Sequence, residues 1–142
     1  MSGEPVMKAI YPLSEKRPAS VGTPRGLSLA DMTLAAVMKG EVTAADVAIT
    51  PETLRLQAGI ADSAGRDRLA RNLERAAELA LIPQEVVMST YELLRPGRSA
   101  SSEALRRRAA ELRDTYRAVL IAGFLEEAAD AYDARGLFTR RF

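Results

Sequence analysis

The sequence predicts an all-α protein in which two long helices and several shorter ones follow an extended, proline-rich arm. Three observations support this fold class. Apolar residues recur at helical spacing through most of residues 28–135, clear helix-start and helix-stop signals divide that stretch, and no segment alternates apolar and polar residues over a convincing length. We therefore divide the chain into an arm, residues 1–27, and a helical domain, residues 28–142.

Proline dominates the arm. It contains four of the seven prolines of the chain: Pro5, Pro12, Pro18 and Pro24. Proline fixes φ and lacks an N–H donor, so the arm is expected to be extended. Several apolar residues, Tyr11 and Leu13 among them, are available to be buried. We expect the arm to lie along a surface, either of its own domain or of a partner.

Helical patterning begins at Ser28, a residue type that caps helix N-termini. The pattern predicts a short helix through Lys39, with Gly40 in the left-handed position that often follows a helix end. Residues 43–46 are expected to form a single helical turn.

The first long helix begins at Thr50-Pro51, a hydroxyl cap followed by proline at the first helical position. No proline follows before Pro83, so a single helix of roughly 30 residues is expected. Gly59 and Gly65 either weaken its middle or permit close approach of another helix. Two acid–arginine pairs at i,i+4 spacing are expected on its exposed side: Asp62 with Arg66, and Asp67 with Arg71.

Two further helices complete the pattern. One begins at Pro83 and is ended by the Arg-Pro-Gly-Arg-Ser segment at 95–99. The second long helix then runs from the serine-rich segment at 99–103 to Arg135, with Gly136 just past its end. Alanine is abundant in both long helices, so their core is thin, and helices of this kind usually need a partner to complete their burial.

Composition excludes several functions. The chain has no cysteine and no histidine, which removes disulfide scaffolds, thiol nucleophiles, Cys/His zinc sites and Ser–His–Asp triads. Its net charge of +1 demands neither nucleic acid nor membrane. The longest apolar run, residues 118–125, is far shorter than the roughly 20 residues that span a bilayer. These features favour a cytoplasmic protein.

Two charged patterns could indicate binding sites. Glu126 and Asp130 share a helix face and could hold a divalent cation, but a solvated face near Arg135 is the favoured interpretation. The arginine run at 106–108 is interpreted as solvated helix surface rather than a nucleic-acid contact, because consecutive residues spread around the helix axis.

A third pattern leaves an alternative function open. Gln57, Ala61 and Gly65 have the opening spacing of a helix-turn-helix, in which glycine makes the turn. Polar residues then stand where a recognition helix needs apolar ones, at Arg66, Arg71 and Glu74. A small DNA-binding regulator using residues 57–75 is kept as an alternative, beside a helical adaptor for an unrelated complex.

Motifs along the chain combine into a family pattern. They are YPLSEKRP at 11–18, TPRG at 23–26, GEV at 40–42, TLRLQA at 53–58, AGRDRLARN at 64–72, RAAEL at 75–79, YELLRPGRS at 91–99 and EAADAY at 127–132. In their order and spacing the sequence resembles the small (gamma) subunit of adenosylcobalamin-dependent glycerol and diol dehydratases, from about residue 11 to residue 135. Gln84 and residues 138–142 depart from the family pattern. Diol dehydratase small subunits often carry a longer N-terminal extension, so its absence here favours the glycerol type.

The resemblance implies a division of labour. A large TIM-barrel subunit would hold the substrate, the radical chemistry and a potassium or calcium ion, and would bind adenosylcobalamin together with a medium subunit. This chain would dock on the large subunit within a dimer of heterotrimers, in the cytoplasm or inside a bacterial microcompartment. It would carry no catalytic, cofactor-binding or metal-binding residue, and would contact neither nucleic acid nor membrane.

Residue types and family-like motifs together predict the subunit interface. Arginines and tyrosines are enriched among the side chains that dominate binding energy at interfaces. The predicted interface residues are Tyr11, Arg66, Arg71, Tyr91, Arg95, Arg98 and Tyr116.

Overall fold

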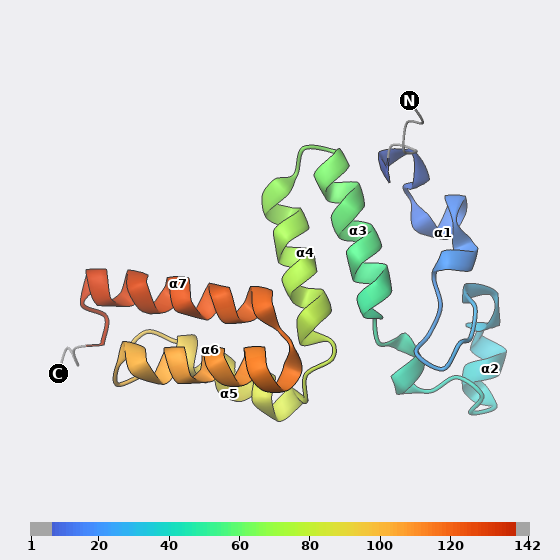
Figure 1. Cartoon of the computed structure of the whole chain (residues 1–142). Coiled ribbons are helices and arrows are strands. Elements are labelled where there is room, and N and C mark those ends of the chain that lie inside the picture. The colour runs from blue at the N-terminus through green and yellow to red at the C-terminus, as the bar shows by residue number, and fades with distance from the viewer. Residues whose placement is uncertain (1–6, 139–142) are drawn as a thin grey trace. The chain divides into compact units, whose positions relative to one another are not determined.

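The computed structural model describes residues 7–138 of the chain (Figure 1). Within this range the secondary structure is helical apart from one isolated β-bridge between Gly22 and Ser28, which confirms the all-α prediction. The α-helices are α1 (Leu13–Lys16), α2 (Leu34–Met38), α3 (Pro51–Ser63), α4 (Asp67–Leu79), α5 (Gln84–Leu94), α6 (Ser102–Tyr116) and α7 (Val119–Arg135). Four 3-10 turns complete the set: η1 (Met7–Ile10), η2 (Pro18–Ser20), η3 (Leu29–Asp31) and η4 (Ala44–Val47).

The chain forms two compact units, residues 1–80 and residues 81–142. The first contains the arm, α2 and the hairpin of α3 and α4. The second contains α5 and the hairpin of α6 and α7. The division proposed from the sequence, an arm of residues 1–27 and a helical domain of residues 28–142, stays a prediction.

The described part of the arm consists of short helical turns joined by extended residues. Turn η1 packs on α3. Gly59 permits the close approach, because a Cβ atom at that position would lie 2.9 Å from the terminal methyl carbon of Met7. The arm therefore covers a surface of its own unit, and Leu13 is buried there.

The single long helix predicted from Thr50 to about residue 82 is wrong, because the chain reverses at Gly65 to give α3 and α4. Gly65 has φ +72°. Its N–H donates to the Asp62 carbonyl at 2.8 Å, and the Arg66 N–H donates to the Ala61 carbonyl at 2.8 Å. These two bonds form a Schellman motif, which ends a helix at a left-handed glycine. The predicted start is confirmed, since the Thr53 N–H donates to the Thr50 hydroxyl at 3.2 Å.

The second predicted long helix is also two helices, α6 and α7. The reversal occurs at Arg117, whose φ of 58° is left-handed although the residue is not glycine. The carbonyl of Leu112 accepts a hydrogen bond from the Ala118 N–H at 3.0 Å, and Ala118 is buried. Burial of apolar residues on both sides of the turn therefore stabilises a conformation that arginine disfavours by itself. At the far end, Gly136 has φ 62° and ends α7 as predicted.

The predicted short helix from Ser28 through Lys39 is divided into η3 and α2. The Asp31 carboxylate accepts from the Ser28 N–H at 2.8 Å and from its hydroxyl at 2.7 Å, which closes η3 as a single turn. Thr33 then caps a new helix, because its hydroxyl accepts from the Ala36 N–H at 3.2 Å. Two predictions nearby are confirmed: Gly40 has φ 74° after α2, and the turn expected at 43–46 is η4.

Candidate subunit interface

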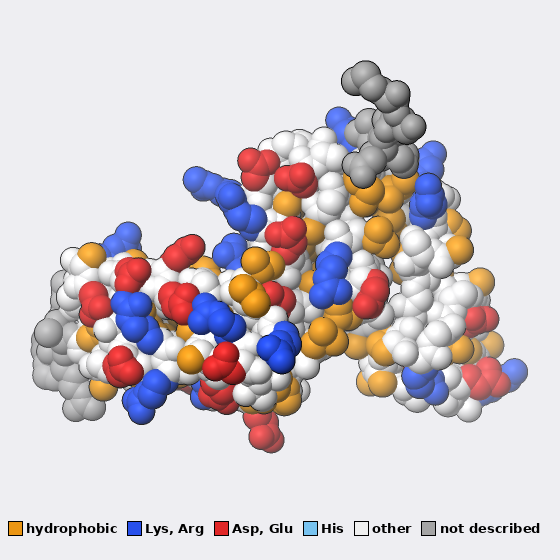
Figure 2. Space-filling view, in the orientation of Figure 1, with side chains coloured by type: hydrophobic (Ala, Val, Ile, Leu, Met, Phe, Trp, Pro, Cys, Tyr) orange, Lys and Arg blue, Asp and Glu red, His pale blue; other side chains and the backbone are white. Residues whose placement is uncertain are grey.

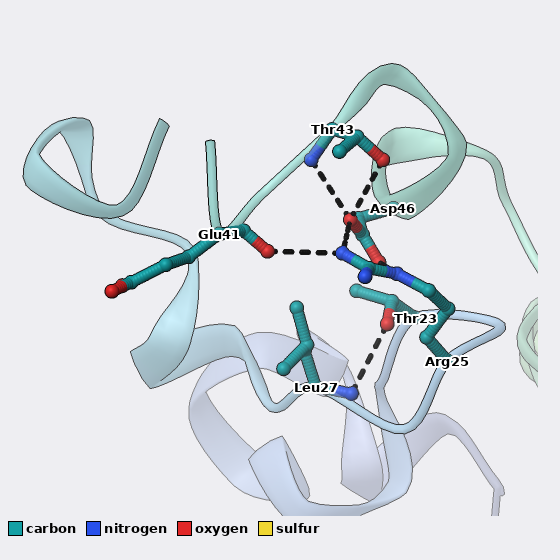
Figure 3. A network of polar contacts seen from close by, with 6 residues as sticks. All are labelled: Thr23, Arg25, Leu27, Glu41, Thr43 and Asp46. Carbon is teal, nitrogen blue, oxygen red and sulfur yellow. Dashed lines mark hydrogen bonds and ion pairs between the residues drawn. The ribbon is translucent and has the colours of Figure 1, made fainter. Parts of the chain in front are cut away.

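A buried carboxylate organises the segment between α2 and α3. Asp46 is 3% exposed. It accepts from Nε of Arg25 at 2.8 Å, from the Thr43 N–H at 2.8 Å and from the Thr43 hydroxyl at 3.1 Å, and forms an ion pair with a terminal nitrogen of Arg25 (Figure 3). The same guanidinium donates to the carbonyl of Glu41 at 2.9 Å. The network thus joins the loop at 23–27 to residues 41–46.

Electrostatics favour the ionised form of this carboxyl group. The hydrogen bonds from Arg25, followed by those from Thr43, hold the pKa of Asp46 far below its ordinary value, although burial acts in the opposite direction. Burial of this carboxylate is tolerated because its oxygens have hydrogen-bond partners and an ion-pair partner. The network holds two segments of the chain together. Sequence reasoning missed it because Arg25 and Asp46 are 21 positions apart.

The Arg25–Asp46 network supports a short segment whose large apolar side chains are exposed. In α2 only Ala36 is buried, whereas Leu34 and Met38 are each 79% exposed. Val47, which follows Asp46 directly, is 71% exposed. Hydrophobic side chains reach the surface around α1 and α2 in the space-filling view (Figure 2). An apolar surface of this kind is typical of a contact with another protein.

A groove lies between the arm and the α3/α4 hairpin, with a volume of about 660 Å³. Its walls come from three segments: Lys8, Tyr11 and Leu13 of the arm, Gln57, Ile60, Ala61 and Ala64 at α3, and Arg66, Leu69 and Leu73 at α4. Two residues predicted for the interface, Tyr11 and Arg66, therefore line the same groove. The groove depends on the reversal at Gly65, since a continuous helix would not bring residues 57 and 73 to the walls of one cavity.

The other five predicted interface residues lie elsewhere. Arg71 is exposed on α4, outside the groove lining, and Tyr91 is 61% exposed on α5. Tyr116 is partly buried at the end of α6. Arg95 forms an ion pair with Glu92 at 3.0 Å, and Arg98 is exposed in the turn after α5. Whether these side chains contact a partner stays a prediction.

Several charge pairings differ from those expected. Asp62 and Arg66 lie on opposite sides of the Gly65 turn, so they do not share a helix face, and no ion pair joins Asp67 to Arg71 among residues 7–138. Glu126 and Asp130, which the sequence offered as ligands of a divalent cation, form ion pairs with arginines instead. Glu126 binds Arg113 at 2.9 Å and Asp130 binds Arg106 at 2.5 Å, which joins α6 to α7.

No metal-binding cluster is found in the described part of the chain, where no three His, Cys, Asp or Glu side chains gather. No helix within residues 7–138 combines the length and apolar character needed to cross a membrane. The arrangement offers surfaces for contact with another protein.

Comparison with known proteins identifies the family. Residues 6–139 match the family model for the dehydratase small subunit. The chain belongs to the dehydratase small subunit family. It is 50% identical over 125 residues to the propanediol dehydratase small subunit of Salmonella typhimurium and to that of Citrobacter freundii, and each alignment covers 88% of this chain and 72% of the relative. The resemblance drawn from the sequence is confirmed, and this dehydratase small subunit is part of an enzyme. The alternative of a DNA-binding regulator or unrelated adaptor is not supported.

Proposed function

We propose that this dehydratase small subunit is a non-catalytic component of an adenosylcobalamin-dependent enzyme that converts a vicinal diol to an aldehyde and water. The observation that carries the proposal is the 50% identity to two propanediol dehydratase small subunits. The sequence favoured the glycerol type, but these relatives favour propane-1,2-diol as the substrate of the assembled enzyme, with glycerol as the second candidate.

The chemistry of the holoenzyme is assigned to its other subunits. A large TIM-barrel subunit and a medium subunit bind adenosylcobalamin, and the large one holds a potassium or calcium ion. The cofactor supplies the radical that begins the dehydration. The residues of this chain do not fit a role in binding either group: it has no histidine to coordinate cobalt, and its described carboxylates form no cluster for a cation.

The work of this chain is to assemble and stabilise the holoenzyme, a dimer of heterotrimers in the cytoplasm or in a bacterial microcompartment. Exposed apolar side chains support this role, since each large one fully buried by a partner contributes about 1.5–3 kcal/mol. Leu34, Met38 and Val47 are the most exposed of them in the first unit. A partner surface that covers them would bury apolar side chains of α2 and η4 that this chain leaves exposed.

Coexpression of the large and medium subunits with and without this chain tests the proposal. With the chain present, we expect one complex containing all three subunits and aldehyde formation from propane-1,2-diol or glycerol when adenosylcobalamin is added. Without it, the yield of assembled complex and its activity should fall. Full assembly and activity of the two other subunits alone would contradict the proposed role.

A second measurement tests the division of labour. Cobalamin is titrated into the isolated small subunit, and into the complex as a positive control, with its absorption spectrum as the readout. We expect a spectral change only with the complex. A change with the isolated chain would show that the cofactor is bound here, contrary to the assignment.

A further inference from the structure

The groove between the arm and the α3/α4 hairpin has an apolar floor and a cationic rim. Leu13, Ile60 and Ala61 are buried along it, and Lys8 and Arg66 are the charged residues among its described lining residues. Among residues 7–138 no carboxylate lines the groove, and none forms an ion pair with either cation. Both positive charges are therefore available to a ligand.

The position of each wall is fixed by local structure. Met7 packs against Gly59, which holds η1 on α3. The Schellman motif at Gly65 sets the direction of α4 and places Arg66 at the N-terminal end of that helix. Tyr11, 65% exposed, and Leu69, 43% exposed, are lining residues that leave large apolar area uncovered. Aromatic and arginine side chains on a preformed groove are typical anchors of a protein interface.

We infer that this groove receives an apolar segment bearing a carboxylate from another subunit of the dehydratase. The inference rests on the proposed function and names the surface and the partner chemistry that it requires. The apolar floor binds the apolar side chains, and the carboxylate pairs with Lys8 and Arg66. Charge complementarity selects this occupant, because opposite charges stabilise a contact and like charges placed together across an interface weaken it.

A second copy of this chain is a poorer occupant. In a two-fold symmetric contact the same patch meets itself. The rims of two such grooves would bring Lys8 and Arg66 of one copy toward the same cations of the other. An acidic segment of a different subunit avoids this repulsion.

The first test reverses the rim charges in the complex. Lys8→Glu/Arg66→Glu is coexpressed with the large and medium subunits, and the affinity of the small subunit for the other two is measured at low salt. Because like charges then face the partner carboxylate, we expect affinity to fall about tenfold or more. Lys8→Gln/Arg66→Gln should reduce affinity less and should flatten its dependence on salt.

Arg68→Glu is the matched control, since Arg68 is an exposed arginine of the same helix outside the groove lining. We expect its affinity to stay within about twofold of wild type. If the control and the double variant lost affinity equally, or if neither lost affinity, the inference would be overturned. Failure of the wild-type chain to bind the other subunits would instead contradict the proposed function itself.

The second test does not depend on charge-reversed variants. Photoreactive benzoyl-phenylalanine replaces Tyr11 in the otherwise wild-type complex, and the cross-linked peptide is identified by mass spectrometry. We expect a peptide of the large or medium subunit with aspartate or glutamate beside apolar residues. A cross-link to a second copy of this chain, a cross-link to a peptide without an acid, or no cross-link in an assembled complex would each overturn the inference.

Discussion

The two helical hairpins of this protein solve the same packing problem with different residues. In the α6/α7 hairpin three leucines, Leu105, Leu112 and Leu125, are almost completely buried, and two ion pairs join the helices. In the α3/α4 hairpin the buried residues of α4 are alanines, Ala70 and Ala77, and the large buried apolar side chains, Leu54 and Ile60, come from α3. The groove lies beside this second core.

The two hairpins obtain their stability from different sources. Burial of large side chains stabilises α6 and α7 from within, because the hydrophobic contribution grows with the apolar area removed from water. In the α3/α4 hairpin only α3 buries large apolar side chains, and the first unit is supplemented by the arm over α3 and by the Arg25–Asp46 network. It also leaves Leu34 and Met38 uncovered. The hairpin whose large buried side chains come from one helix and the proposed docking groove therefore belong to the same unit.

The largest expected effect comes from the leucine core. Leu125→Ala should lower the free energy of unfolding of the full chain by about 2–5 kcal/mol, because it leaves a cavity at a fully buried site. Leu69→Ala in α4, where the side chain is 43% exposed, should cost about 1 kcal/mol or less. Urea unfolding followed by far-UV circular dichroism measures both. Equal losses would contradict the dependence of the loss on burial.

An intermediate loss is expected for Asp46→Asn, which weakens the network of the first unit. The folded-state pKa of Asp46 is lowered by Arg25, so the ionised carboxylate stabilises the fold above the unfolded-state pKa of about 4. That contribution is lost as the pH falls toward the folded-state pKa. The free energies of unfolding of wild type and variant should therefore differ most near neutral pH and become equal in acid.

The matched control is Glu41→Gln, because Glu41 takes part in the network only through its carbonyl oxygen. The free energy of unfolding is measured for wild type and both variants at a series of pH values. We expect Glu41→Gln to match wild type at each pH. A constant difference between wild type and Asp46→Asn at every pH would contradict the assigned role of the carboxylate.

The smallest effects compare the two turns and should have opposite signs. Gly65→Ala should destabilise the chain by about 1 kcal/mol, since alanine disfavours the left-handed φ of +72° although no atom lies within 4 Å of the added Cβ. Arg117→Gly relieves the same conformation in the other hairpin and should stabilise it by about 0.5–1 kcal/mol. Thermal unfolding of both variants gives the signs, and two changes of the same sign would refute this account of the turns.

Local signals account for most of what could be predicted. Thr50-Pro51 started a helix, Gly40 and Gly136 followed helix ends, and residues 43–46 formed a turn, because caps and left-handed glycines act through hydrogen bonds between near neighbours. Gly65 is ambiguous in the sequence, which allows a weakened helix middle or close approach of another helix, and places a turn there only in the helix-turn-helix alternative. Only packing between α3 and α4 decides between these outcomes.

The candidate interface, too, depends on packing that local signals do not specify. Residue type and motif predict Tyr11 and Arg66 as interface residues, and nothing in their spacing of 55 positions places them on one groove. The reversal at Arg117 carried no glycine or proline signal, so the pattern favoured a continuous helix. The residues that support the groove, Gly59 and Met7, could not be paired from the sequence because their contact is tertiary.

The all-α class, the lack of the cysteine and histidine that thiol and zinc chemistry need, and the resemblance to the dehydratase small subunits could all be inferred from the sequence. Periodicity, caps and residue types are local properties, and the sequence states them directly. The tertiary structure alone decided that each long apolar pattern folds back into a hairpin and that the arm, α3 and α4 enclose a cationic groove. Those outcomes depend on which apolar surfaces bury one another, and that burial joins residues far apart in the chain.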